Sequence, residues 1–164
     1  MSLTTYCSYD EVRSALGVND LELTDRVLAL PVYEMGLLRE VSRLSTALNA
    51  AFSSVAAKAP ASRTLSEQTL YEAMRLFSVY TVAKQVGVSL PTFAPKDVSD
   101  GKASTSRFAG EPFKATLAAI DEYLAAYKAD LKTAFDAFNG ASSTSSTVTI
   151  GLVASARSYD PVTG

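Results

Sequence analysis

The sequence predicts an all-α fold: a helical bundle of about four helices with a long ordered loop and an extended C-terminal arm. Apolar residues recur at helical spacing over most of the first 140 residues. Capping boxes led by serine or threonine mark two helix starts. After Gly140 the segment GASSTSST is typical of a flexible linker. We therefore expect a helical domain over residues 1–140, followed by a linker and arm over residues 141–164.

The first two predicted helices are short. Ser8-Tyr-Asp-Glu11 is a capping box that opens the first helix, and Gly17 is a natural stop. Val12 and Leu16 lie four residues apart on one face, so this helix is expected to dock on the body of the domain. A second start follows at Thr24, and Pro31 predicts a kink or break because it lacks a backbone donor.

A long helix is predicted next, because apolar residues keep helical spacing from Tyr33 to Val55. The segment around Pro60 is a predicted loop. Thr64-Leu-Ser-Glu67 is a second capping box, which opens a helix expected to run to about Gly87. Its apolar surface is broad enough to predict burial on two sides. The residues of its two stripes are Leu70, Met74, Phe77 and Thr81, with Ala73, Leu76, Tyr80 and Ala83 beside them.

Residues 89–110 contain prolines, glycines and many small polar residues, which predicts a loop of unusual length. Phe93, Val98 and Phe108 are apolar anchors that a disordered linker would not need. We therefore expect an ordered excursion that touches a partner. Within it, Asp100 and Gly101 favour a chain reversal beside Lys102.

The last helix is predicted from Pro112, which suits a first helical turn, to the stop at Asn139-Gly140. Apolar residues repeat at near-heptad spacing from Phe113 to Phe138. We expect this helix and the helix of residues 33–55 to pack antiparallel, with the middle helix between them.

The arm after the linker alternates like a strand, with Val148, Ile150 and Leu152 on one side. No other strand is expected in the chain. Since a lone strand leaves its backbone groups unpaired, we expect it to pair with another molecule. Tyr159 lies beyond the linker, where a partner's pocket and disorder are equally open interpretations.

Composition excludes several classes of function. The chain has fifteen Lys and Arg against 17 Asp and Glu, and its basic residues are scattered singly, which argues against a dedicated nucleic-acid binder. One cysteine, Cys7, and no histidine exclude an internal disulfide, a zinc site and a cysteine-histidine nucleophile pair, and no cofactor is expected. Without a bilayer-spanning apolar run or a signal peptide, the chain is expected in the cytosol and not in a membrane.

The motifs with catalytic meaning are weak. Ser99 and Lys102 match the S-x-x-K spacing of serine enzymes that use a lysine base, but they stand in a Gly-containing loop instead of on a helical turn. Gly101-Lys102 lacks the flanking residues of a phosphate-binding loop. Carboxylate pairs such as Asp121 and Glu122 fit a solvated helix face. The sequence therefore predicts a protein that is not an enzyme.

Two stretches carry a resemblance to a known family. YCSYDEVRSALGVNDLELTDRVLALPVYE before a long helix, and FAPKDVSDGKASTSRF before another, resemble head-tail connector (adaptor) proteins of tailed bacteriophages, over most of residues 6–140. The resemblance implies a small helical bundle that assembles as a ring, commonly of about twelve copies, beneath the portal. An arm or loop reaches the portal, another surface receives a tail or nozzle protein, and the family has no catalytic residues to carry over.

This resemblance implies a structural virion protein of the neck region, made in the host cytoplasm. DNA would pass through the ring without specific binding, because the formal net charge is -2 per chain. Two other hypotheses remain open. One is a monomeric helical binding module that grips one partner through the loop of residues 89–110, and the other is a small hydrolase that uses Ser99 and Lys102.

Overall fold

The computed structural model describes residues 2–93, 97–99, 104–106 and 112–143, with side chains over 2–90 and 114–141. The all-α class is confirmed, although the described residues form six α-helices and not about four. A two-stranded hairpin and two 3₁₀ turns, Leu3–Thr5 and Pro60–Ser62, accompany them. The helices are α1 (Tyr9–Leu16), α2 (Asp25–Leu28), α3 (Pro31–Leu44), α4 (Leu48–Ala56), α5 (Leu65–Phe93) and α6 (Pro112–Ser143).

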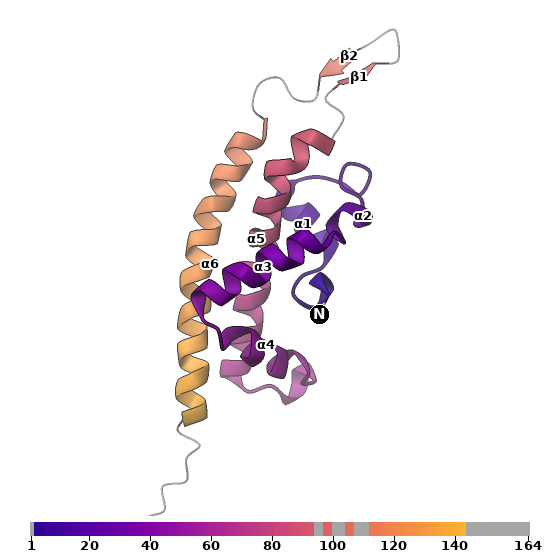
Figure 1. The fold of residues 1–164 in the computed structure, drawn as a ribbon. Coiled ribbons are helices and arrows are strands. Elements are labelled where there is room, and N and C mark those ends of the chain that lie inside the picture. Colours follow the sequence, from indigo (N-terminus) through magenta and orange to yellow (C-terminus); the bar gives the residue numbers. More distant parts are fainter. Residues whose placement is uncertain (1, 94–96, 100–103, 107–111, 144–164) are drawn as a thin grey trace, which may run out of the picture.

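Helix α5 is the centre of the fold. It packs along α6 on one side and contacts α1, α3 and α4 on its other sides, with α3 crossing it obliquely (Figure 1). The predicted middle helix is therefore in the middle, but its long partner is α6 and the N-terminal partner is a set of short helices. The predicted C-terminal arm lies outside the described residues.

The local signals at the start of the chain are confirmed. The Ser8 hydroxyl accepts a hydrogen bond from the backbone N–H of Glu11 at 3.2 Å, and the Glu11 carboxylate accepts from the Ser8 N–H at 2.7 Å. Gly17 ends α1 with a positive φ of 67°, a conformation that glycine adopts without strain. Val12 and Leu16 are buried, and Pro31 separates α2 from α3 as predicted.

The single helix predicted over residues 33–55 is wrong. The backbone turns at Ser45, which is extended (φ −163°, ψ 137°), so that α3 ends at Leu44 and α4 begins at Leu48. The Ser45 hydroxyl accepts from the N–H of Ala47 at 3.3 Å, an alternative to helical bonding that serine readily offers. Leu44 and Leu48 stay in phase across the break, which is why periodicity alone did not show it.

The predicted end of the middle helix at Gly87 is also wrong, because α5 continues to Phe93. Gly87 is buried inside the helix, where an added Cβ would lie 2.8 Å from Leu117 of α6 and 3.1 Å from Leu16 of α1. Glycine is therefore needed for close packing of three helices and does not act as a cap. Likewise α6 passes the predicted stop at Gly140 and ends at Ser143.

The prediction of a loop over residues 89–110 needs two corrections. Its first five residues, 89–93, belong to α5, and the described residues beyond them form an antiparallel hairpin of β1 (Asp97–Ser99) and β2 (Ser104–Ser106). Val98 pairs with Thr105 at the centre of this hairpin, which lies past the ends of α5 and α6 in Figure 1. The expectation that the arm would hold the only strand is therefore wrong.

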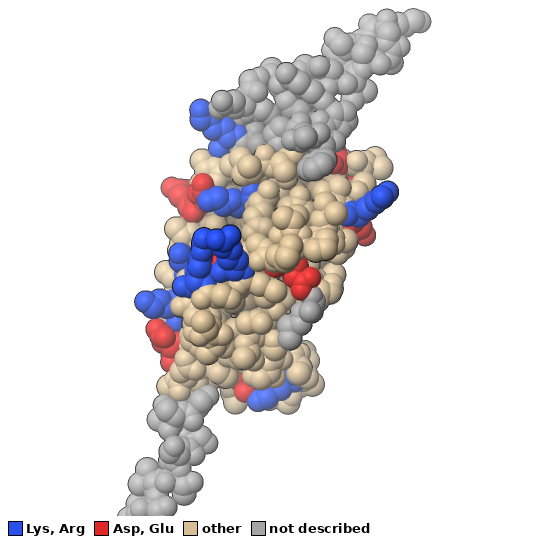
Figure 2. Space-filling view, in the orientation of Figure 1, with Lys and Arg blue, Asp and Glu red and all other residues tan. Residues whose placement is uncertain are grey.

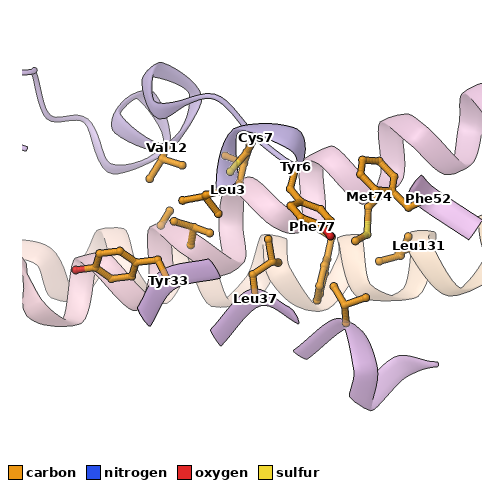
Figure 3. Close-up of a cluster of buried hydrophobic side chains, with 14 of the residues drawn as sticks. Leu3, Tyr6, Cys7, Val12, Tyr33, Leu37, Phe52, Met74, Phe77 and Leu131 are labelled. Carbon is orange, nitrogen blue, oxygen red and sulfur yellow. The ribbon is translucent and has the colours of Figure 1, made fainter. Parts of the chain in front are cut away.

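The core is one continuous cluster with α5 running through it (Figure 3). Met74 and Phe77 of α5 meet Leu37 of α3, Phe52 of α4 and Leu131 of α6, all of them buried. The Phe52 ring lies between those of Tyr6 and Tyr71, at centroid distances of 5.3 and 5.6 Å. The predicted burial of α5 on two sides holds except at Leu76, which is 44% exposed.

Candidate functional site

The site residues predicted from the sequence are not brought together by the described part of the chain. Phe93 is the last residue of α5, and Ser99 is the last residue of β1. The others lie outside the described residues: Asp100, Lys102, Phe108, Val148, Ile150, Leu152 and Tyr159. The partner contacts assigned to them, and the Ser99–Lys102 pair, therefore stay predictions.

The described residues do form a recess between α3, α5 and α6, with a volume of about 700 Å³. We call it the groove. Its apolar lining consists of Val32 from α3, Phe77 and Val88 from α5, and Leu124 from α6. Phe77 is buried in its floor, whereas Val32 and Val88 are 56% and 68% exposed. Exposed apolar side chains beside a recess of this size are typical of a binding surface.

An unpaired hydroxyl lies in this apolar lining. Thr81 of α5 lines the groove and is 3% exposed, yet its Oγ1 has no hydrogen-bond partner among the described residues. Ser78, one turn earlier, donates to the carbonyl oxygen of Met74 at 2.7 Å, so the helix offers a bond that Thr81 does not use. A buried polar atom without a partner costs free energy. This hydroxyl is therefore an unsatisfied polar atom buried beneath the lining of the groove.

Basic side chains surround the groove. Arg43 of α3, Lys84 of α5 and Lys128 of α6 line it together with one acid, Glu40. Figure 2 shows Lys and Arg side chains gathered over α6 and the neighbouring end of α3. Arg43 pairs with Glu40 along α3, and Lys84 Nζ lies 2.6 Å from Asp121 Oδ1. These ion pairs are solvent-exposed and therefore weak, so both Arg43 and Lys84 can pair with an acidic group of a ligand instead.

Gly36 shapes the wall between α3 and α5. A Cβ at this position would overlap the side-chain amide oxygen of Gln85, which also lines the groove. The absent side chain leaves room for the end of the Gln85 side chain against α3. Gly36 in a helix interior has a cost of about 1 kcal/mol relative to alanine, which this close approach explains.

A second, acidic recess of about 510 Å³ lies where α1 meets the loop of residues 17–24. Asp10, Asp20 and Asp25 line it around a single base, Arg13. Arg13 is buried and donates to the Leu23 carbonyl oxygen at 2.8 Å, to Asp10 at 2.7 Å and to Asp25. Arg13 therefore fastens the loop to α1 and pairs with two of the three acids, Asp10 and Asp25.

Three further properties of the described residues concern metal ligands, the cysteine thiol and the helices. Among the described residues, no group of three His, Cys, Asp or Glu side chains stands close enough to hold a metal ion. Burial raises the pKa of the Cys7 thiol to about 12, a change that the nearby Glu11 charge reinforces, so the thiol stays protonated. Of the described helices, none has the length and apolarity needed to cross a bilayer.

Sequence reasoning missed the groove because its residues come from three helices. Two signals were present: Gly36 inside an apolar helix, and Thr81 among the residues of an apolar stripe. Each interrupts a pattern without a local reason. No family model, curated protein or solved structure matches this chain.

Proposed function

We propose that this chain is a structural virion protein, a head-tail adaptor that forms a ring of about twelve copies under the portal of a tailed bacteriophage. The ring joins the portal to a tail or nozzle protein. The resemblance of residues 6–140 to adaptor proteins motivates the proposal. On this view the protein is made in the host cytoplasm and resides in the neck of the virion.

The groove is the observation that carries the proposal. An assembly protein needs apolar surfaces that a partner covers, and the groove presents the exposed side chains of Val32 and Val88. A catalytic function finds no comparable support in the described residues, whose buried thiol is held in its unreactive form. Binding is therefore the activity that these side chains favour.

The proposed ring leaves a passage for DNA. The net charge of −2 per chain disfavours tight binding of the duplex, since a ring adds the charges of its copies. The hairpin β1–β2 and the arm that follows α6, with Val148, Ile150 and Leu152, are the proposed contacts to the portal and the tail protein. Backbone pairing with a partner's sheet edge would fix the arm.

The test is the mass of the native protein, alone and with the purified portal. Twelve copies of a 17.4 kDa chain have a mass of roughly 210 kDa, which native mass spectrometry separates from a monomer. A ring-sized species on its own or on the portal supports the proposal. A protein that stays monomeric and binds one partner, and loses that binding when residues 94–110 are replaced by a short linker, is the monomeric binding module instead.

A further inference from the structure

The loop of residues 17–24, between α1 and α2, presents an apolar side chain between two acids. Leu21 is 86% exposed and stands between Asp20 and Glu22. We call this segment the acidic loop. Its neighbour Leu23 is fully buried, so the loop is anchored in the core next to the exposed residue.

The acidic loop is held in one conformation by its own hydrogen bonds. The Asn19 side-chain oxygen accepts from the N–H groups of Leu21 and Glu22, each at 3.0 Å, and the Glu22 carboxylate accepts from the Asn19 N–H at 3.0 Å. Arg13 holds the Leu23 carbonyl oxygen. Leu21 is therefore presented to solvent by a fixed turn, which lowers the entropy lost when it binds.

The groove is complementary to this loop in charge and in polarity. Its lining carries three bases and one acid, and Asp121 pairs with one of these bases, which leaves a net charge of +1, whereas the loop itself carries two acids, Asp20 and Glu22, and no base. Lys128 forms no ion pair with the described part of the chain. The apolar lining between these bases offers Leu21 a place of burial, and the volume of about 700 Å³ admits a short loop.

The groove and the acidic loop share no residue, so every copy carries both. Leu21 is exposed on its own chain and so does not fill its own groove. A contact between two different surfaces of identical chains is head-to-tail, and such contacts close into rings when the rotation allows it.

We infer that the acidic loop of one copy docks in the groove of the next copy, with Leu21 inserted beside Val32 and Val88. Asp20 then faces Lys128. This inference rests on the proposed function, because it names the contact through which the copies of the ring associate.

Exposed leucines offer a matched pair of variants. Leu21→Asp should weaken self-association by about tenfold or more, because a buried apolar side chain is replaced by a charge. Leu65→Asp is the control, since Leu65 is 85% exposed at the start of α5 and belongs to neither surface. Sedimentation velocity measures the association constant, and circular dichroism verifies that both variants are folded.

Charge reversal tests the pairing directly. Lys128→Glu and Asp20→Lys should each weaken association, and the doubly changed protein should recover most of it. Separately, a mixture of a Leu21→Cys protein and a Val88→Cys protein should form a disulfide-linked heterodimer on mild oxidation. A Leu65→Cys protein mixed with the Val88→Cys protein should not, and the native Cys7 is buried and does not compete.

The outcomes separate this inference from the proposed function. Rings that persist in Leu21→Asp and in both charge-reversed proteins, without the cross-link, overturn the inference and leave the adaptor proposal standing, because another surface then joins the copies. A wild-type protein that is monomeric at every concentration, with and without the portal, overturns both. Loss of rings in the Leu21→Asp protein but not in the Leu65→Asp control, together with formation of the cross-link, supports both.

Discussion

The N-terminal region and the α5–α6 pair are held together in different ways. In the N-terminal region short helices bury apolar side chains and are also fixed by specific polar bonds: Glu11 receives two hydrogen bonds from Arg75 of α5 at 2.6 and 2.7 Å, and the Tyr6 hydroxyl donates to Asn49 at 2.6 Å. The α5–α6 pair relies on an apolar seam that includes Ile120, Leu131 and Ala134. Lys84–Asp121 is its exposed ion pair.

Helix length explains the difference. A helix of four to nine residues gains little from its own backbone bonds, so α1 depends on its capping box and on Arg75, while α2 and α4 depend on tertiary hydrogen bonds. Helices of 29 and 32 residues spread their contacts over many turns, and no single contact decides their packing. Replacing a hydrogen-bonded polar residue should therefore lower the free energy of unfolding more in the N-terminal region than in the α5–α6 pair.

The largest expected effect on stability comes from Phe52, through which the N-terminal region packs against α5. Phe52→Ala removes a fully buried ring that lies between Tyr6 and Tyr71, and we expect a loss of about 3–5 kcal/mol in the free energy of unfolding. Chemical denaturation followed by circular dichroism measures it. A loss below about 1 kcal/mol would mean that the N-terminal region is held by its polar bonds alone.

A smaller effect is expected at Glu11. Desolvation disfavours the charged form of Glu11, but hydrogen bonds from Arg75 and from the backbone and hydroxyl of Ser8 outweigh it, so its pKa lies below the ordinary value. Glu11→Gln should cost about 1–2 kcal/mol at neutral pH, through the weakened cap and the lost charged hydrogen bonds.

The pH dependence of Glu11 gives a second readout. A lowered folded pKa contributes stability that is present above the unfolded pKa, about 4.3, and is lost as the pH falls through the folded value. The stabilities of wild type and Glu11→Gln should therefore converge in acid. A gap that stays constant from neutral to acidic pH would mean that the carboxylate charge contributes nothing.

The smallest effect is expected in the α5–α6 pair. Asp121→Asn breaks the exposed ion pair with Lys84 and should change the free energy of unfolding by less than about 0.5 kcal/mol. The melting temperature in low and high salt measures it. An effect as large as that of Glu11→Gln would erase the contrast between the two regions.

The sequence predicted the elements whose signals are local. The capping boxes at Ser8–Glu11 and Thr64–Glu67 mark true helix starts, because those bonds join residues three apart. The stop at Gly17 is confirmed by its positive φ. The helix stop predicted at Gly87 is wrong because glycine at this position allows close packing against Leu16 and Leu117, which only the tertiary fold brings near.

The candidate site could not be predicted from the sequence for the same reason. Periodicity identified Phe77 and Thr81 as core positions, and both are buried. It does not tell which buried residue borders a recess, since this depends on how α3 crosses α5 and α6. Nor does it separate Leu21 from other apolar residues, because its exposure follows from the Asn19 hydrogen bonds and the burial of Leu23.

The burial of Cys7 allows its modification rate to report local opening of the N-terminal segment. It is the only thiol in the sequence and is 1% exposed, just ahead of α1. A thiol-modifying reagent can reach it only after this N-terminal segment lifts from α5, so the modification rate counts such openings without any added label. In an assembled ring, that rate would record how tightly a neighbouring copy clamps the loop that follows α1.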